Sequence, residues 1–241
     1  SGFNLVINKM DMINQSGSYL ENSAVKSYQW LGLERDIGFL LRGYTTIKDT
    51  DYALLYKSEP EGHRVGFEVD SEIGSVNVYD EITYLWGTDR ISMPGSYQGN
   101  LLSNYFMNVL GINYRFDNDL QITVEHLFND RGDSDNLDVS DIRLKNGVNT
   151  SLNKHISGLS INYEFNPLLI GKYDSKFAWK DSSHQHNLSL ARSLRDNIDF
   201  IIGGQINIGD RPKGNNWQNP NIQSEFGNLT NNYYLKLNCY F

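Results

Sequence analysis

Residues 233–241 read Tyr-Tyr-Leu-Lys-Leu-Asn-Cys-Tyr-Phe, and this stretch decides the fold. Every odd-numbered position in it carries an apolar or aromatic side chain, whereas the even-numbered positions include Lys236 and Asn238. Successive side chains of a β-strand point to opposite faces of the sheet, so a period of two residues indicates a strand. The stretch therefore predicts a strand with one apolar face and one polar face.

The same alternation recurs upstream, in pairs of segments joined by short polar turns. Residues 198–208 place Ile, Phe and Gly at even-numbered positions, and Asp199 and Gln205 are among the residues between them. A further strand is predicted at residues 3–7. Because short turns connect antiparallel neighbours, the pattern predicts an antiparallel up-and-down sheet. The short turns are predicted at residues 72–74, 117–119, 166–167 and 195–197.

The connections between the predicted strands are unequal in length. Short turns alternate with long polar stretches at residues 87–103, 128–153 and 210–228, so short and long connections fall at opposite ends of the strands. One link, at about 181–184, is brief although its place in the chain puts it on the long side. Short turns on one side and long loops on the other are typical of β-barrels that cross a membrane.

Composition excludes several other classes of protein. Lys and Arg number 21 against 29 Asp and Glu, and the net charge of −8 argues against a nucleic-acid-binding surface. No window approaches the roughly 18 consecutive apolar residues that a membrane-spanning helix requires, so a helical membrane protein is excluded. The single cysteine, Cys239, permits no intrachain disulfide. Residues 1–4 contain no export signal, and we expect either a mature chain or a piece of a longer one.

Two architectures accommodate such a meander, a soluble sandwich or barrel and a transmembrane barrel. The predicted strands are about 12 residues long, and their apolar faces end in aromatic residues. Both features favour a transmembrane barrel. In hydrocarbon every backbone amide needs a partner within the protein, so a β-sheet there must close. We therefore predict an all-β fold, an antiparallel up-and-down transmembrane β-barrel of about 12 strands, as a single domain over residues 1–241.

The strand count depends on residues 26–46, which we interpret as one tall strand. A turn at residues 34–36 would divide it and make the number of strands odd, whereas single-chain bacterial barrels have an even number. About 12 strands would leave a narrow pore. An alternative stays open, in which the chain is the C-terminal part of a larger barrel with a wider pore.

The final stretch, from Tyr233 to Phe241, resembles the last strand of Gram-negative outer-membrane β-barrels, in which alternating apolar residues lead to a terminal phenylalanine. With its short turns and long loops the chain also looks like the porin-like proteins of this class, and no signature selects a subfamily. The resemblance implies the bacterial outer membrane as the location, with the lipid bilayer and lipopolysaccharide as partners. It also implies that the outer-membrane assembly machinery recognises the strand ending in Phe241.

The polar parity of the predicted strands collects charged residues of both signs. Facing carboxylates and cations would create a transverse field that passes small polar solutes and rejects apolar ones. We therefore predict a porin-like channel for passive diffusion of small polar solutes or ions, which is not an enzyme and needs no cofactor. In the alternative, these charges pair with one another and occlude the lumen of a structural or partner-binding barrel. The candidates for lining a lumen or constriction are Glu68, Asp70, Glu81, Arg115, Glu125, Glu164, Lys172, Asp174, Lys176, Asp199 and Lys236.

Two predicted outer loops carry further candidate residues. Residues 130–141 hold five Asp, a density of the hard oxygen ligands that calcium prefers. This stretch lacks the Gly and the final Glu of an EF-hand loop, so we favour a solvated acidic loop over a calcium site. The candidate metal ligands are Asp133, Asp135 and Asp138. The loop at 210–228 looks like an exposed binding or lid loop, and its candidates for contact with a ligand are Arg211 and Trp217.

An enzymatic alternative rests on residues 183–187, Ser-His-Gln-His-Asn, which place a hydroxyl beside an imidazole at the outer end of a predicted strand. A catalytic triad is defined by geometry, and proximity in sequence does not establish one. Two alternating histidines also share a face and could hold a metal ion weakly. We interpret this stretch as interfacial polar residues.

Overall fold

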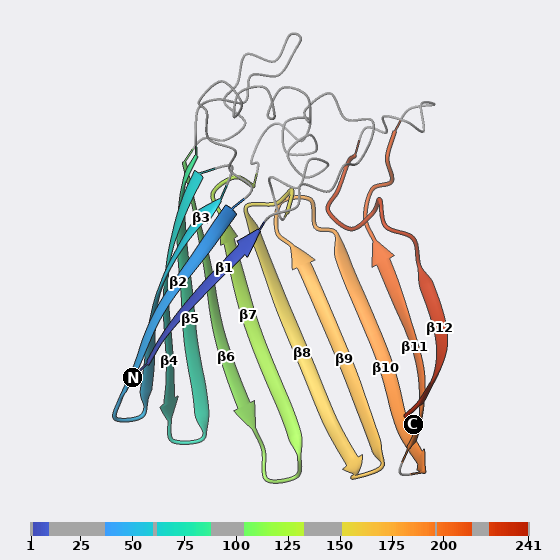
Figure 1. The fold of residues 1–241 in the computed structure, drawn as a ribbon. Coiled ribbons are helices and arrows are strands. Elements are labelled where there is room, and N and C mark those ends of the chain that lie inside the picture. The colour runs from blue at the N-terminus through green and yellow to red at the C-terminus, as the bar shows by residue number, and fades with distance from the viewer. Residues whose placement is uncertain are drawn as a thin grey trace. The chain divides into compact units, whose positions relative to one another are not determined.

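The computed structural model describes residues 2–9, 37–59, 62–87, 104–132, 151–195, 197–213 and 222–240. All regular secondary structure in these ranges is β-strand (Figure 1). None of these ranges contains a helix that is long and apolar enough to cross a membrane. The strands are β1 (Gly2–Lys9), β2 (Ile37–Ile47), β3 (Thr50–Glu59), β4 (Gly62–Ile73), β5 (Val76–Gly87), β6 (Tyr105–Arg115), β7 (Leu120–Asn129), β8 (His155–Asn166), β9 (Leu169–Ala178), β10 (His184–Arg195), β11 (Ile198–Ile208) and β12 (Asn232–Cys239).

Each strand pairs with the next one along the chain, in the order β1 to β12. The pairings of β1 to β3 and of β7 to β12 are antiparallel. This confirms the prediction of an all-β, antiparallel up-and-down sheet of about 12 strands. Of the tall strand predicted over residues 26–46, the part from Ile37 onward belongs to β2, and residues 26–36 lie outside the described ranges.

The sheet consists of two compact units. The first contains residues 1–70 and 81–107, and the second contains residues 71–80 and 108–241. In the second unit, short turns join β6 to β7, β8 to β9 and β10 to β11 at the lower end in Figure 1. The described residues between β7 and β8, between β9 and β10 and between β11 and β12 lie at the opposite end.

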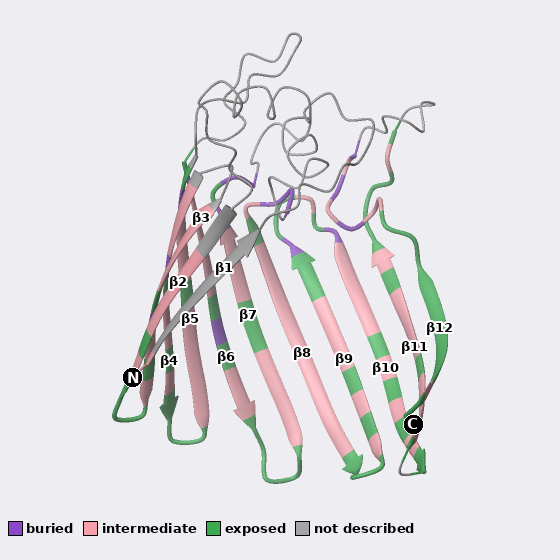
Figure 2. Ribbon diagram, in the orientation of Figure 1, coloured by how far each residue is buried: buried purple, intermediate pink, exposed green. Residues whose placement is uncertain are grey.

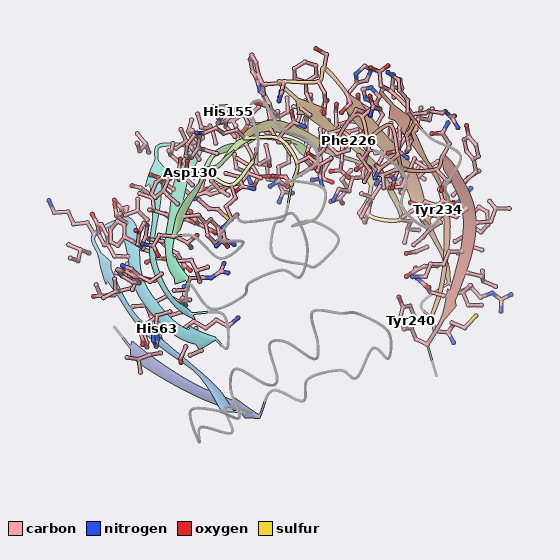
Figure 3. The ribbon with its side chains drawn as sticks, turned by 90° about the horizontal axis from the view of Figure 1, so that it is seen from above. His63, Asp130, His155, Phe226, Tyr234 and Tyr240 are labelled. Atoms are coloured by element: carbon pink, nitrogen blue, oxygen red, sulfur yellow. The ribbon has the colours of Figure 1, made fainter. Side chains whose placement is uncertain are left out.

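The strands of the second unit carry side chains on both sides of the sheet (Figure 3), and the strand registers place most of the polar side chains on one face. Residues that lie directly opposite each other in a sheet share a face. One transverse row on the apolar face consists of Ile122, Ile161, Tyr173, Leu188, Gly204 and Tyr233. A neighbouring row on the other face is polar throughout and consists of Thr123, Ser160, Asp174, Asn187, Gln205 and Asn232.

Few strand residues of this unit are buried, and apart from Gly111 in β6 the buried residues gather at the end that carries the long connections (Figure 2). On the apolar face, Leu188 is 64% exposed and Tyr233 is 75% exposed. A row of large apolar side chains so open to the surroundings is rare on proteins that live in water. The apolar face therefore lacks the cover that a soluble sandwich would give it within the part of the chain that the structure describes.

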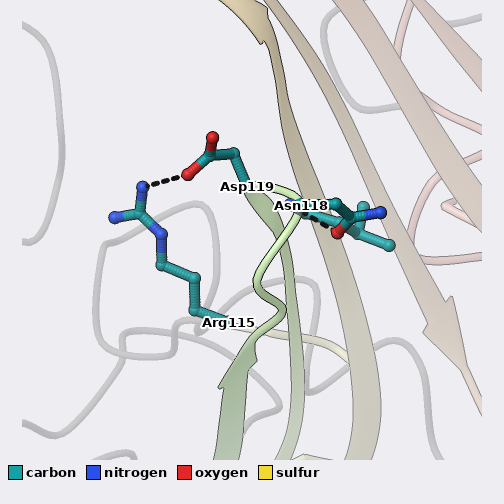
Figure 4. A network of polar contacts seen from close by, with 4 residues as sticks. Arg115, Asn118 and Asp119 are labelled. Carbon is teal, nitrogen blue, oxygen red and sulfur yellow. Dashed lines mark hydrogen bonds and ion pairs between the residues drawn. The ribbon is translucent and has the colours of Figure 1, made fainter.

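The turn between β6 and β7 shows how a short connection is held (Figure 4). The Arg115 guanidinium donates to Asp119 Oδ1 at 2.8 Å, and Asn118 Oδ1 accepts from the Leu120 amide at 3.3 Å. Asp119 has a φ of 63°, in the left-handed region that Asp and Asn tolerate better than most residues. The predicted turn at residues 117–119 is thus confirmed.

Gly111 of β6 provides space for the ring of Tyr79, which reaches across to β7. A Cβ atom at Gly111 would lie within 2.1 Å of Tyr79 Cζ, far inside van der Waals contact. The Tyr79 hydroxyl donates to Glu125 Oε1, so the missing side chain at Gly111 allows this contact to form.

We predict that Gly111→Ala destabilises the sheet, because the new methyl group must displace the Tyr79 ring. The free energy of unfolding should fall by about 1–3 kcal/mol, the usual range for a forced overpacking. The matched control is Gly43→Ala, where nothing lies within 4 Å of the new Cβ and where the change should be neutral or slightly stabilising. Urea unfolding in detergent measures both, and equal midpoints for the two variants would contradict the prediction.

Candidate functional site

The candidate site is the polar face of β7 to β11 in the second unit. Seven of the predicted lumen residues lie on this polar face or on its continuation in β12: Glu125, Glu164, Lys172, Asp174, Lys176, Asp199 and Lys236. Arg115 ends β6 at the short turn, where it pairs with Asp119. The structure therefore brings these charges onto one face, and whether that face lines a lumen stays a prediction.

The three predicted lumen residues of the first unit are Glu68, Asp70 and Glu81. Glu68 on β4 accepts a hydrogen bond from Arg42 Nη2 at 2.6 Å, and both side chains are about one-third exposed. Asp70 and Glu81 are exposed. Arg42 interrupts an apolar run but was not predicted as a lumen residue, because its parity could not be assigned inside the long stretch at 26–46.

Two adjoining pockets lie on the polar face. One of about 310 Å³ is lined by residues that include Ser160, Asp174, Gln185 and Asn187. The other, of about 340 Å³, extends toward the long connections and is lined by residues that include Leu127, Ile156, Glu225 and Phe226. Both pockets share Glu125, Gly158 and Lys176, so these three residues mark the place where the pockets meet.

Charged side chains and neutral amides line the first pocket, and several of them are hydrogen-bonded to one another. Asp174 Oδ1 accepts from the Ser160 hydroxyl at 2.8 Å and lies 3.5 Å from Lys172 Nζ. Two neutral amides, Gln185 and Gln205, donate to Asn207 Oδ1 at 2.8 Å and 3.2 Å. The pocket wall is thus a mixture of satisfied polar groups and charges, which suits a small hydrophilic solute better than an apolar one.

The far side of the second pocket is formed by the connection between β11 and β12. Within the predicted exposed loop at 210–228, Ile222, Ser224 and Phe226 are buried, and Phe226 lines the pocket together with Glu225. Arg211 is exposed, as an external ligand contact would require. Trp217 lies outside the described residues. The segment at 222–226 is therefore packed against the polar face, which corrects the expectation that the whole loop is exposed.

This segment is held by a cluster that we call the loop clasp, made of Asn153, Asp181 and Glu225. Glu225 Oε2 accepts hydrogen bonds from the Leu152 amide at 2.7 Å and the Asn153 amide at 2.9 Å. Asp181 Oδ2 accepts from Asn153 Nδ2 at 2.7 Å and from the Glu225 amide at 2.8 Å. The clasp therefore joins all three long-side connections of the second unit.

Burial raises the pKa of the Glu225 carboxyl above its ordinary value. Hydrogen bonds from Asn153 and Leu152 oppose this shift because they stabilise the carboxylate, and the nearby charge of Asp181 adds to it. The net result is a carboxyl group that holds its proton more tightly in the folded protein than in the unfolded chain.

The structure does not assemble the Ser183–His184 pair that the enzymatic alternative requires. The Ser183 hydroxyl is buried and accepts from the Phe226 amide at 3.2 Å. His184 Nδ1 lies 3.2 Å from the carbonyl oxygen of Ser182. The Ser183 hydroxyl thus helps to hold the segment at 222–226, and among the described residues no histidine side chain is hydrogen-bonded to it.

The candidate calcium ligands Asp133, Asp135 and Asp138 lie outside the described residues. Within the described ranges, no group of three or more His, Cys, Asp or Glu side chains is placed to hold a metal ion.

The loop clasp was not predicted from the sequence. Its only sequence signal is the brief link at 181–184, whose Asp181 turns out to bind the two longer connections.

We predict that Glu225 contributes less to the stability of the folded protein as the pH rises. Because the folded pKa of Glu225 is raised, its contribution to stability is fully present below the ordinary pKa of a glutamic acid and is lost as the pH rises through the folded pKa. The free energy of unfolding should therefore fall as the pH rises from the ordinary pKa of a glutamic acid through the folded pKa of Glu225. Glu225→Gln, which cannot ionise, should lack this part of the dependence. Parallel pH profiles for the two proteins in urea unfolding would refute the assignment.

Comparison with known proteins adds a likeness in fold. The search of protein-family models and the search of curated protein sequences find no match. Among solved structures, the chain is similar to one described as "Asymmetric conductivity of engineered proteins", with 12% identity and a TM-score of 0.47. It is also similar to a mutant of the Rh. blastica porin, with 12% identity and a TM-score of 0.46. Each match covers 72% of this chain, and the chain spans about half the length of the solved chains that it matches.

Proposed function

We propose that this chain forms a β-barrel in the bacterial outer membrane and acts as a porin-like channel for passive diffusion of small polar solutes or ions. In this proposal the sheet closes into a single transmembrane domain with its polar face inside. The observation that carries the proposal is the segregation of side chains in the second unit, where one face is apolar and open and the other is polar and charged.

Lipid is the surrounding that suits the apolar face. On β10 and β11 the side chains of Leu188, Leu190, Ile202, Ile206 and Ile208 are 39–64% exposed. Acyl chains would cover them without the penalty that water imposes. Toward the long connections the same face carries a cluster of aromatic and imidazole rings. Trp179 Nε1 donates to Ser157 Oγ at 2.9 Å, and His126 lies against both His155 and Trp179. Amphipathic rings of this kind are typical of the boundary between hydrocarbon and headgroups.

Contact with lipopolysaccharide belongs to this proposal, because the ring cluster lies at the end of the strands that would face outward. Lys154 lies over the Phe128 ring at 5.2 Å and is 3.3 Å from Asp130, so a cation is present at the same level. Recognition by the outer-membrane assembly machinery stays a prediction, since Phe241 is outside the described residues.

The polar face supports passage of solutes more than complete occlusion. Pairs such as Lys172 with Asp174 neutralise part of the charge, as the occluded alternative requires. A pocket of about 310 Å³ nevertheless remains beside them, and it is bordered by Glu125 and Lys176. A second candidate function is a structural or partner-binding barrel with an occluded lumen, and the observation that favours it is the inward packing of residues 222–226.

We predict that an arginine on the apolar face of β10 destabilises the protein far more than one on the polar face. Leu188→Arg would place a charge against lipid and should lower the free energy of unfolding by about 2–4 kcal/mol if it lies near the bilayer midplane. Asn187→Arg, the neighbouring position on the other face, lies opposite Asp174 and should change stability little. Unfolding in lipid vesicles measures the difference, and equal effects would mean that the apolar face does not meet lipid.

We predict steady unitary currents when the folded protein is inserted into planar bilayers. Their size should be that of a narrow pore, because about 12 strands enclose little space beyond their side chains. A heat-modifiable, folded barrel that stays electrically silent would reject the channel and favour the occluded barrel.

A further inference from the structure

A transverse row of residues crosses the polar face at the place where the two pockets meet. Glu125 of β7 lies opposite Gly158 of β8, Gly158 lies opposite Lys176 of β9, and Lys176 lies opposite Gln185 of β10. Neighbouring strands are about 4.8 Å apart, so the backbones that carry the carboxylate and the ammonium group are separated by about 10 Å. A carboxylate and a cation thus flank a residue that has no side chain.

Gly158 leaves open space between these two charges, and we call this space the notch. A Cβ atom at Gly158 would come no closer than 3.9 Å to Glu125 Oε2 and the Ser175 carbonyl oxygen, so the site is not crowded by its neighbours. Gly158 needs no left-handed backbone, since Gly74 alone among the described glycines has a positive φ. Glycine weakens a strand interior and often marks a place where another molecule approaches closely.

The two charges are held on either side of the notch without pairing to each other. The Tyr79 hydroxyl donates to Glu125 Oε1, which leaves Oε2 as the oxygen nearer to Gly158. Lys176 makes no ion pair within the part of the chain that the structure describes, whereas Lys172 on the same strand lies 3.5 Å from Asp174. The tyrosine therefore keeps the carboxylate in place while the ammonium group stays available.

We propose that the notch binds a compact zwitterion, such as a free α-amino acid, with its ammonium group at Glu125 and its carboxylate at Lys176. The proposal rests on the channel function, in so far as the channel gives solutes access to the polar face. Gln185, next to Lys176 in the row, offers an amide to the same carboxylate. An uncharged solute would leave both protein charges without an opposite charge, and a simple ion would neutralise only one of them, so the pair selects for a solute that carries both charges.

Alanine and its uncharged isomer lactamide test this proposal with solutes of the same atomic composition. Saturation-transfer NMR on the folded protein in detergent should detect binding of alanine and little binding of lactamide. Lys176→Met should weaken alanine binding about tenfold or more, and Gly158→Val should do the same because it fills the notch while keeping both charges. The matched control is Lys180→Met, which removes an exposed lysine in the link between β9 and β10 and should leave alanine binding unchanged.

Equal binding of the two isomers, or alanine binding that survives Lys176→Met, would overturn the notch proposal. Two variants protect the test from misfolding, because loss of binding counts only in a variant whose heat-modifiable migration matches that of the parent protein. Bilayer currents are measured separately. Alanine binding without current would retain the notch and reject the channel, whereas current without alanine binding would reject the notch and retain the channel.

Discussion

The strict alternation of side chains between two faces of paired strands is the constraint on which the rest of this structure depends. A register shift of one residue in any strand would exchange its apolar and polar side chains. In the second unit the registers stay in phase from β7 to β12, so a row that begins with Thr123 stays polar as far as Asn232. The two irregularities, between Glu164 and Asn166 and between Ser193 and Arg195, lie beside the short turns, where they leave the rows undisturbed.

The strands that could be predicted from the sequence are those in which the alternation is clean. Residues 198–208 are an example, and β11 has these same bounds. Strand β3 was not predicted, because adjacent Leu54 and Leu55 break its alternation although they point to opposite faces. Asp80 interrupts the apolar parity of β5, and its carboxylate accepts a hydrogen bond from Asn108 on the next strand. A partner on another strand has no signal in the local sequence.

The residues of the candidate site also differ in whether local sequence could predict them. The charges of the polar face were predictable because parity alone places them, as for Glu125 and Lys176. The loop clasp was not predictable, because Asn153 and Glu225 are separated by 72 residues and their bond depends on how two loops fold. The role of Ser183 was equally unpredictable from local sequence. Its position beside His184 makes it a candidate nucleophile, whereas in the structure its buried hydroxyl accepts a hydrogen bond from the Phe226 amide.

The loop clasp also has a mechanical consequence. Three connections that are remote in sequence converge on a few oxygen atoms, and Asp181 in the shortest of them binds groups from both of the others. A pull on any one of these connections is therefore shared by the hairpin ends on either side. Under force, the three connections of the second unit should therefore detach together and not one after another.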